Sequence, residues 1–137
     1  MPGIFVYGTL LRGECRHHII AAAETLRIVA ARTPGRLVLA GEDLDEYAGG
    51  YPGLLPPRTD SQWVAGEYVE VAEVERLLPR LDFVEHYDVR DEAGSLYLRR
   101  VVDVVLEDES AERAWTYLFN GSCDPRAIIA SGDWRRR

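Results

Sequence analysis

With 137 residues, 47% of them hydrophobic, the chain has the size of one compact domain, and we expect a single domain over residues 1–137. Its net charge of -7 lacks the basic excess on which sequence-independent nucleic-acid binding depends, so we expect no nucleic-acid partner. All 16 basic residues are arginine, which excludes a Schiff-base lysine, a P-loop lysine and a Ser-Lys dyad.

The sequence also predicts the cellular compartment and the absence of a disulfide, metal or cofactor. No stretch approaches the ~18 apolar residues of a membrane span, and the first residues do not resemble a signal peptide, so we expect a cytoplasmic protein without a membrane partner. Cys15 and Cys123 lack CxxC spacing, and His17-His18 has no spaced carboxylate partner. We therefore expect no disulfide, metal or cofactor.

The first half of the chain alternates short apolar runs with turn residues. Residues 4–7 predict a buried strand, and residues 16–26 have the apolar spacing of a helix. Residues 28–31 and 36–39 predict strands on either side of Pro34-Gly35, which suggests a hairpin or bulged pair. Residues 41–60 are rich in acidic residues, glycine and proline, and predict a loop without persistent regular structure.

The second half carries the stronger β signals. Residues 63–71 predict a central strand, and residues 72–81 predict a helix that Pro79 breaks before a second helical piece near residues 81–87. Residues 96–106 and 114–119 predict an antiparallel hairpin. In its first strand, one face holds Leu96, Leu98, Val102, Val104 and Leu106, and the other holds Tyr97, Arg99 and Asp103. The order of elements predicts an α+β domain with a curled, mainly antiparallel sheet.

Tyr7-Gly8-Thr9-Leu10 leaves the first predicted strand through a glycine. Consecutive backbone N–H groups in such a turn can point into one hollow and bind an anion or a developing oxyanion. The same glycine would also serve an ordinary strand-ending turn, so the motif alone leaves both interpretations open.

Glu85 lies beside the apolar residues Phe83 and Val84 in a segment expected to face the core. A carboxylate held there has its pKa raised by desolvation, which suits proton transfer near neutral pH. The alternative for Glu85 is a solvated glutamate at a helix end.

These segments, with others in the same order, resemble the gamma-glutamylcyclotransferase-like (AIG2-like) family over nearly the whole chain. The matching motifs are Val6-Tyr7-Gly8-Thr9-Leu10, Tyr51-Pro52-Gly53, Val64-Ala65-Gly66-Glu67-Tyr68-Val69, Leu81-Asp82 with Glu85-His86-Tyr87, Tyr97-Leu98-Arg99, and Ser131-Gly132-Asp133-Trp134. The resemblance implies a six- or seven-stranded, curled, β-barrel-like sheet with helices packed outside it. It also implies a transferase that cyclises a gamma-glutamyl amide, releasing an amine and 5-oxoproline.

The resemblance assigns roles to particular residues. Glu85 matches the glutamate that takes the proton from the attacking α-amine and returns it to the leaving nitrogen, and Gly8, Thr9 and Leu10 match the turn whose amides hold the substrate. Tyr7, Tyr97 and Tyr117 are candidates to orient the substrate through their hydroxyls, with core packing as the alternative. Arg12 and Arg99 are candidates to bind a substrate carboxylate, with surface positions as the alternative.

The identity of the substrate stays open at this point. His86 stands where many relatives have glycine; in the pocket it would narrow the space or add a second titrating group, and the alternative is an exposed histidine at a helix end. Cys15 is a candidate for the pocket mouth, and residues 41–60 are expected to shape the leaving-group side. Two alternatives remain: a noncatalytic binding protein of the same fold, and an enzyme that removes a gamma-glutamyl protecting group from a larger amine. The oligomeric state is open.

Overall fold

The computed structural model describes residues 2–40, 50–121 and 125–137. Its elements in chain order are β1 (Gly3–Val6), α1 (His17–Ala21), β2 (Thr25–Pro34), β3 (Arg36–Ala40), β4 (Tyr51–Leu55), β5 (Trp63–Val71), α2 (Val74–Val84), β6 (Tyr97–Leu106), β7 (Ala111–Phe119), and the short 3-10 segments Pro125–Ala127 and Trp134–Arg136. Among these residues, no helix is long and apolar enough to cross a membrane.

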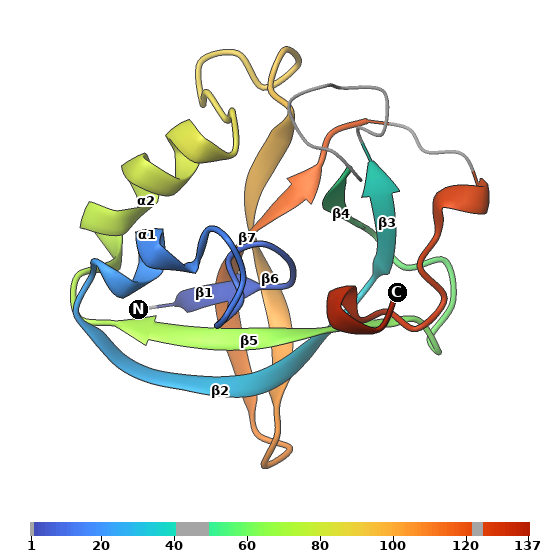
Figure 1. The fold of residues 1–137 in the computed structure, drawn as a ribbon, viewed down its shortest axis with the longest axis horizontal. Helices are drawn as coiled ribbons and strands as arrows, with labels where there is room; N and C mark the ends of the chain where they lie inside the picture. Colours follow the sequence, from blue (N-terminus) through green and yellow to red (C-terminus); the bar gives the residue numbers. More distant parts are fainter. Residues whose placement is uncertain (1, 41–49, 122–124) are drawn as a thin grey trace.

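The core of the fold is a closed barrel with the strand order β1-β5-β2-β6-β7 (Figure 1). Neighbouring strands are antiparallel except β1 and β7, whose parallel pairing closes the barrel. The predicted α+β class and barrel-like sheet are confirmed, and so are the central strand β5 and the β6–β7 hairpin. The barrel has five strands, while β3 and β4 form a separate two-stranded sheet.

Burial explains why β1 can occupy the centre of this arrangement. Ile4, Phe5 and Val6 are all buried, as befits a strand with neighbours on both sides. Helices α1 and α2 lie next to each other against one side of the barrel, and the β3–β4 sheet lies on the other side (Figure 1). The chain leaving β1 therefore emerges between the helices and the small sheet.

The region between the first turn and β3 differs from the prediction in two ways. The helix spans only His17–Ala21, and from Thr25 onward the chain is β2, because its β-branched residues pair along the whole length of β5. The predicted pairing of residues 28–31 with residues 36–39 is also wrong. Gly35 turns the chain out of the barrel, so β2 pairs with β5 and β6 while β3 pairs with β4.

The predicted loop over residues 41–60 is wrong in part. Residues 51–55 form strand β4, whereas residues 41–49 lie outside the described part of the chain. Pro52 is tolerated there because β4 belongs to a two-stranded sheet and needs ladder bonds on one side only. Gly53 allows close packing, since a Cβ at this position would lie 2.9 Å from the Cβ of Phe119.

Helix α2 runs without a break from Val74 to Val84, so the predicted interruption at Pro79 is wrong. Pro79 lies on the exposed side of the helix, where water can bind the carbonyl that its missing N–H leaves unpaired. The opposite side packs on the barrel through four buried residues at helical spacing: Val74, Leu77, Leu78 and Leu81. Helix packing thus outweighs the local effect of the proline and places Glu85 at the C-cap.

Strand β6 has buried residues on both of its faces. Val104 and Leu106 are buried on one face, and Tyr97 is buried on the other. The ring of Tyr97 packs against Tyr51 and Phe119, because the β3–β4 sheet covers that end of β6. Both faces of β6 therefore contribute to the interior, and Tyr97 becomes available to a pocket.

Candidate active site

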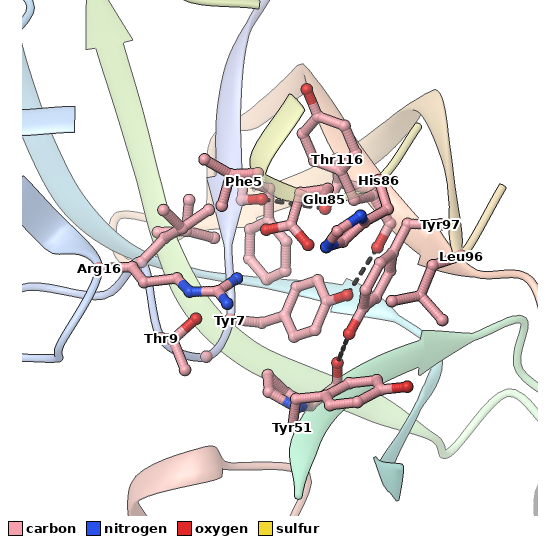
Figure 2. A pocket seen from close by; sticks show the side chains of 16 residues that line it. Phe5, Tyr7, Thr9, Arg16, Tyr51, Glu85, His86, Leu96, Tyr97 and Thr116 are labelled. Carbon is pink, nitrogen blue, oxygen red and sulfur yellow. Dashed lines mark hydrogen bonds between the residues drawn. The ribbon is translucent and has the colours of Figure 1, made fainter. Parts of the chain in front are cut away.

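A pocket opens where the turn after β1, the C-terminal end of α2 and the start of β6 meet, and it holds about 580 Å³ of space, part of it open to solvent (Figure 2). All of the catalytic and substrate-binding candidates predicted from the sequence line it: Tyr7, Gly8, Thr9, Leu10, Glu85, Tyr97 and Tyr117. The remaining lining residues are Phe5, Val6, Arg16, Tyr51, Pro52, Val84, His86, Leu96 and Thr116.

The turn after β1 has its carbonyl groups occupied. These oxygens accept hydrogen bonds as follows: Gly8 O from the Leu11 amide at 3.0 Å, Thr9 O from the Arg16 amide at 2.8 Å, and Leu10 O from His17 Nδ1 at 2.9 Å. Within the described residues, no acceptor engages the N–H groups of Gly8, Thr9 and Leu10. The turn can therefore offer consecutive amides to an anionic group in the pocket.

A buried carboxylate on β5 fixes this turn in place. Glu67 accepts the backbone N–H of Arg12 at 2.8 Å through one oxygen and Arg12 Nε at 3.0 Å through the other. The C-terminal segment adds a further bond, from the Arg135 guanidinium to the Arg12 carbonyl. Arg12 is therefore tied to Glu67 and does not line the pocket, so its expected contact with a substrate carboxylate is not supported.

Replacing Glu67 by Gln is expected to loosen the turn. Gln has only one acceptor oxygen, so one of the two hydrogen bonds from Arg12 is lost and the other loses its charge, and a hydrogen bond to a charged group contributes about 1.5–3 kcal/mol to folding. KM for a substrate held by the turn should rise more than kcat falls. Glu70→Gln on the same strand is the control, because its ion pair with Arg27 is half exposed and should contribute less than about 1 kcal/mol. Equal thermal melting and equal KM in the two variants would contradict the anchoring role.

Glu85 caps the C-terminal end of α2 and directs its carboxylate into the pocket (Figure 2). The side chain is buried, and desolvation raises its pKa from 4.5 to about 7, partly offset by the positive charge of Arg16. In the described part of the chain, no hydrogen bond engages the carboxylate. It is thus open to a ligand, and it can exist in both protonation states near neutral pH.

The three tyrosines at the pocket use their hydroxyl protons within the protein. Tyr7 donates to the Tyr117 carbonyl at 2.6 Å, Tyr97 donates to the Pro52 carbonyl, and Tyr117 donates to Asp82 Oδ1 at 2.7 Å. Burial raises the pKa of all three, so the hydroxyls stay protonated. With the proton committed, what a hydroxyl can offer to a ligand is an oxygen lone pair, which suits an ammonium or amide N–H.

Arg99 supports the end of α2 and does not line the pocket. Its guanidinium pairs with Asp82 at 2.8 Å and lies over the rings of Tyr87 and Trp115. The expected role of Arg99 as a ligand for a substrate carboxylate is therefore not supported either. The arginine that does line the pocket is Arg16, which points its guanidinium toward Glu85 (Figure 2). The sequence pattern showed Arg16 only as the start of a helix.

The cysteines and histidines form no centre in this region. Cys15 is a free, exposed thiol and is not among the pocket-lining residues, while Cys123 lies outside the described residues. Over residues 2–40, 50–121 and 125–137, no group of three or more His, Cys, Asp or Glu side chains could hold a metal ion.

Comparison with known proteins agrees with this geometry. The family model described as "Gamma-glutamyl cyclotransferase, AIG2-like" matches residues 4–136. The chain belongs to this family. As a member of the AIG2-like gamma-glutamyl cyclotransferases it is an enzyme, and the resemblance drawn from its motifs is confirmed.

Three relatives illustrate the relationship. "Gamma-L-glutamyl-butirosin B gamma-glutamyl cyclotransferase" from Niallia circulans is 38% identical over 136 residues, covering 99% of this chain and 77% of the relative. The crystal structure of an AIG2-like protein from Mus musculus superposes with a TM-score of 0.66 at 27% identity, covering 93% of this chain and 82% of the mouse chain. YkqA from Bacillus subtilis also gives a TM-score of 0.66, at 28% identity, but this AIG2-like chain spans only 40% of its length.

Proposed function

We propose that this cyclotransferase acts on a gamma-glutamyl amide, releases an amine and 5-oxoproline, and uses Glu85 as its general acid and base. The observation that carries the proposal is a buried carboxylate with a pKa of about 7, without a hydrogen bond from any described residue, in the same pocket as the amides of residues 8–10. A group with this pKa is suited to accept a proton in one step and to donate it in the next.

The two ends of the pocket suit the two charges of a glutamyl group. The α-carboxylate would bind the amides of Gly8, Thr9 and Leu10, with Arg16 as a charged partner. The α-ammonium would then lie between Glu85 and the lone pairs of the tyrosine hydroxyls. This placement directs the α-nitrogen and the γ-carbonyl into the same pocket, as ring closure requires.

The reaction then needs proton transfer and positioning. Glu85 takes a proton from the α-ammonium, and the freed amine forms a bond to the γ-carbon. As the bond from the γ-carbon to the leaving nitrogen breaks, Glu85 returns the proton to that nitrogen. The nitrogen that has attacked, now part of the ring, loses a second proton. The departing amine takes up this second proton and leaves as an ammonium ion. Because the nucleophile and the carbonyl belong to one molecule, holding the chain folded supplies a large part of the rate, and no step demands a cofactor.

The size of the leaving amine is suggested by a relative. The Niallia circulans protein is named for a gamma-glutamyl group on butirosin B, which makes removal of a gamma-glutamyl group from a larger amine the preferred form of the proposal for this chain. Measuring 5-oxoproline release from a panel of gamma-glutamyl amides with small and large amines tests it directly. Binding without release from any amide would favour a noncatalytic role instead.

Arg16→Gln is expected to alter both substrate binding and the pH profile. In the wild type, kcat/KM should rise through pH 7, because only the Glu85 carboxylate accepts the ammonium proton. Arg16 lowers the pKa of Glu85, so removal of Arg16 should shift this rise in kcat/KM to higher pH. Loss of a charged hydrogen bond to the α-carboxylate should also raise KM by about 10- to 100-fold.

The control for this experiment is Arg80→Gln, which removes an exposed arginine of α2 that does not line the pocket. This control variant should leave the pH dependence of kcat/KM and the value of KM unchanged. If kcat/KM of Arg16→Gln rises at a lower pH than that of wild type, or at the same pH, the result would contradict the assigned contact between Arg16 and Glu85.

A further inference from the structure

His86 occupies a backbone position that favours glycine. Its φ is 52°, and the other non-glycine residue with a positive φ in the described part of the chain is Glu109, in the β6–β7 turn. The hydrogen bonds around His86 are those of a Schellman motif: the Tyr87 amide binds Asp82 O at 2.9 Å, and the His86 amide binds Phe83 O at 3.3 Å. A side chain at this position is strained, whereas glycine is not.

Contacts within the protein do not account for this strain. The imidazole of His86 lines the pocket and is exposed. In the described residues, it has no hydrogen bond, ion pair or ring contact. Figure 2 shows the ring beside the Glu85 carboxylate, on the side away from Arg16. The chain thus holds a polar, unpartnered ring at the pocket, directly after the proposed catalytic carboxylate.

The position of His86 corresponds to one part of the substrate. The proposed function places the glutamyl group toward Thr9 and Arg16, and it requires the leaving nitrogen to lie next to Glu85. The rest of the leaving amine must then extend away from Arg16, past His86. Leu96, whose amide donates to the His86 carbonyl at 3.0 Å, lines the pocket on this side and offers apolar surface to a carbon skeleton.

We propose that His86 is a specificity-determining residue that hydrogen-bonds a hydroxyl group on the leaving amine, a few bonds from the scissile nitrogen. This inference rests on the proposed function. An imidazole has one donor and one acceptor when neutral, so it matches a hydroxyl, which both donates and accepts. The site favours amino alcohols over alkylamines because the imidazole can form a hydrogen bond to the hydroxyl group that an alkylamine lacks.

A matched pair of substrates tests the proposal: the gamma-glutamyl amides of 3-aminopropan-1-ol and of propylamine. Wild type should favour the hydroxylated amide in kcat/KM by about 2- to 10-fold, as expected for one hydrogen bond. His86→Gly should abolish this preference, so that the ratio of the two kcat/KM values falls to about 1. His86→Asn, which tolerates the same φ and retains hydrogen-bonding groups, should keep part of the preference.

Failure to fold does not obscure this test, because glycine relieves the positive φ and His86→Gly should melt at or above the wild-type temperature. A preference unchanged in His86→Gly would overturn the proposal, and so would an equal loss of activity toward both amides. If wild type releases 5-oxoproline from neither amide, the proposed function fails. Calorimetric Kd values for the two amides still test the contact in that case, and an equal Kd ratio in wild type and His86→Gly would overturn it.

Discussion

Replacing Glu85 by Gln is expected to lower kcat for 5-oxoproline release by about 10³- to 10⁴-fold. The amide keeps the size of the side chain but cannot take a proton from the α-ammonium at neutral pH. A general acid or base contributes about 10²- to 10⁴-fold, and one group that serves both proton transfers should lie at the upper end. The affinity for a non-cyclising gamma-glutamyl analogue should change much less than kcat, because the turn and Arg16 remain in place.

The same substitution should stabilise the fold above pH 7. Burial raises the pKa of Glu85 from 4.5 to about 7, so the folded state holds this proton more tightly than the unfolded state, and stability falls as the pH rises between these values. Gln carries no charge, so its burial costs no free energy of charge desolvation at any pH. Glu85→Gln should therefore exceed wild type in stability above pH 7 by up to about 3 kcal/mol, and the difference should vanish below pH 4.5.

Thermal melting across this pH range, together with 5-oxoproline release, separates a catalytic from a structural role. Glu75→Gln is the matched control, because Glu75 lies exposed on the same helix and should affect neither measurement. Wild-type turnover in Glu85→Gln would remove Glu85 from the mechanism. A variant that has lost both its turnover and its folded transition would show that Glu85 is needed for structure alone.

Gly8→Ala is expected to reduce kcat/KM by about 10²-fold. A Cβ on residue 8 would lie 2.1 Å from Cγ of Pro52, closer than any real contact, so either the turn or β4 must move. Pro52 is itself held in place, because its carbonyl accepts the Tyr97 hydroxyl. A shift of about 1 Å in the amides that hold the substrate can cost 10²-fold in rate, even though the reacting groups are intact.

Gly13→Ala in the same turn segment supplies the control. A Cβ on residue 13 meets no atom within 4 Å, but the φ of +83° strains any side chain, so this variant should lose about 1 kcal/mol of stability and retain its kcat. Steady-state kinetics and melting curves of the two variants test the distinction. If both lose stability to a similar degree and both retain wild-type kcat/KM, the turn does not hold the substrate.

The parts of the fold that the sequence predicted correctly have strong local signals. Strand β1 is a short apolar run ended by glycine, and the β6–β7 hairpin follows alternating and β-branched residues around a turn. Pro79 and β4 were mispredicted because their outcome depends on packing. A buried face at helical spacing keeps α2 whole across Pro79, and pairing with β3 orders a proline- and glycine-containing strand.

The residues of the candidate site likewise include some that local sequence patterns predicted and others that they did not. The turn of residues 7–10 and Glu85 carry recognisable local patterns, and they line one pocket. The arginines could not be assigned, because each depends on a partner distant in sequence: Glu67 holds Arg12 across 55 positions, and Asp82 holds Arg99 across 17. Arg16 reaches the pocket only because the turn folds back over the barrel, and no local pattern distinguished it from the other arginines.

The parallel pairing of β1 with β7 bears on how the protein is made. Tyr7 bonds to the Tyr117 carbonyl across 110 positions, and Thr116 bonds to the Phe5 carbonyl across 111. Strand β1 must therefore wait until β7 has been made before the barrel can close, and such long-range contacts slow folding. During that interval the apolar β1 has an edge without its partner, which exposes the incomplete barrel to aggregation through that edge.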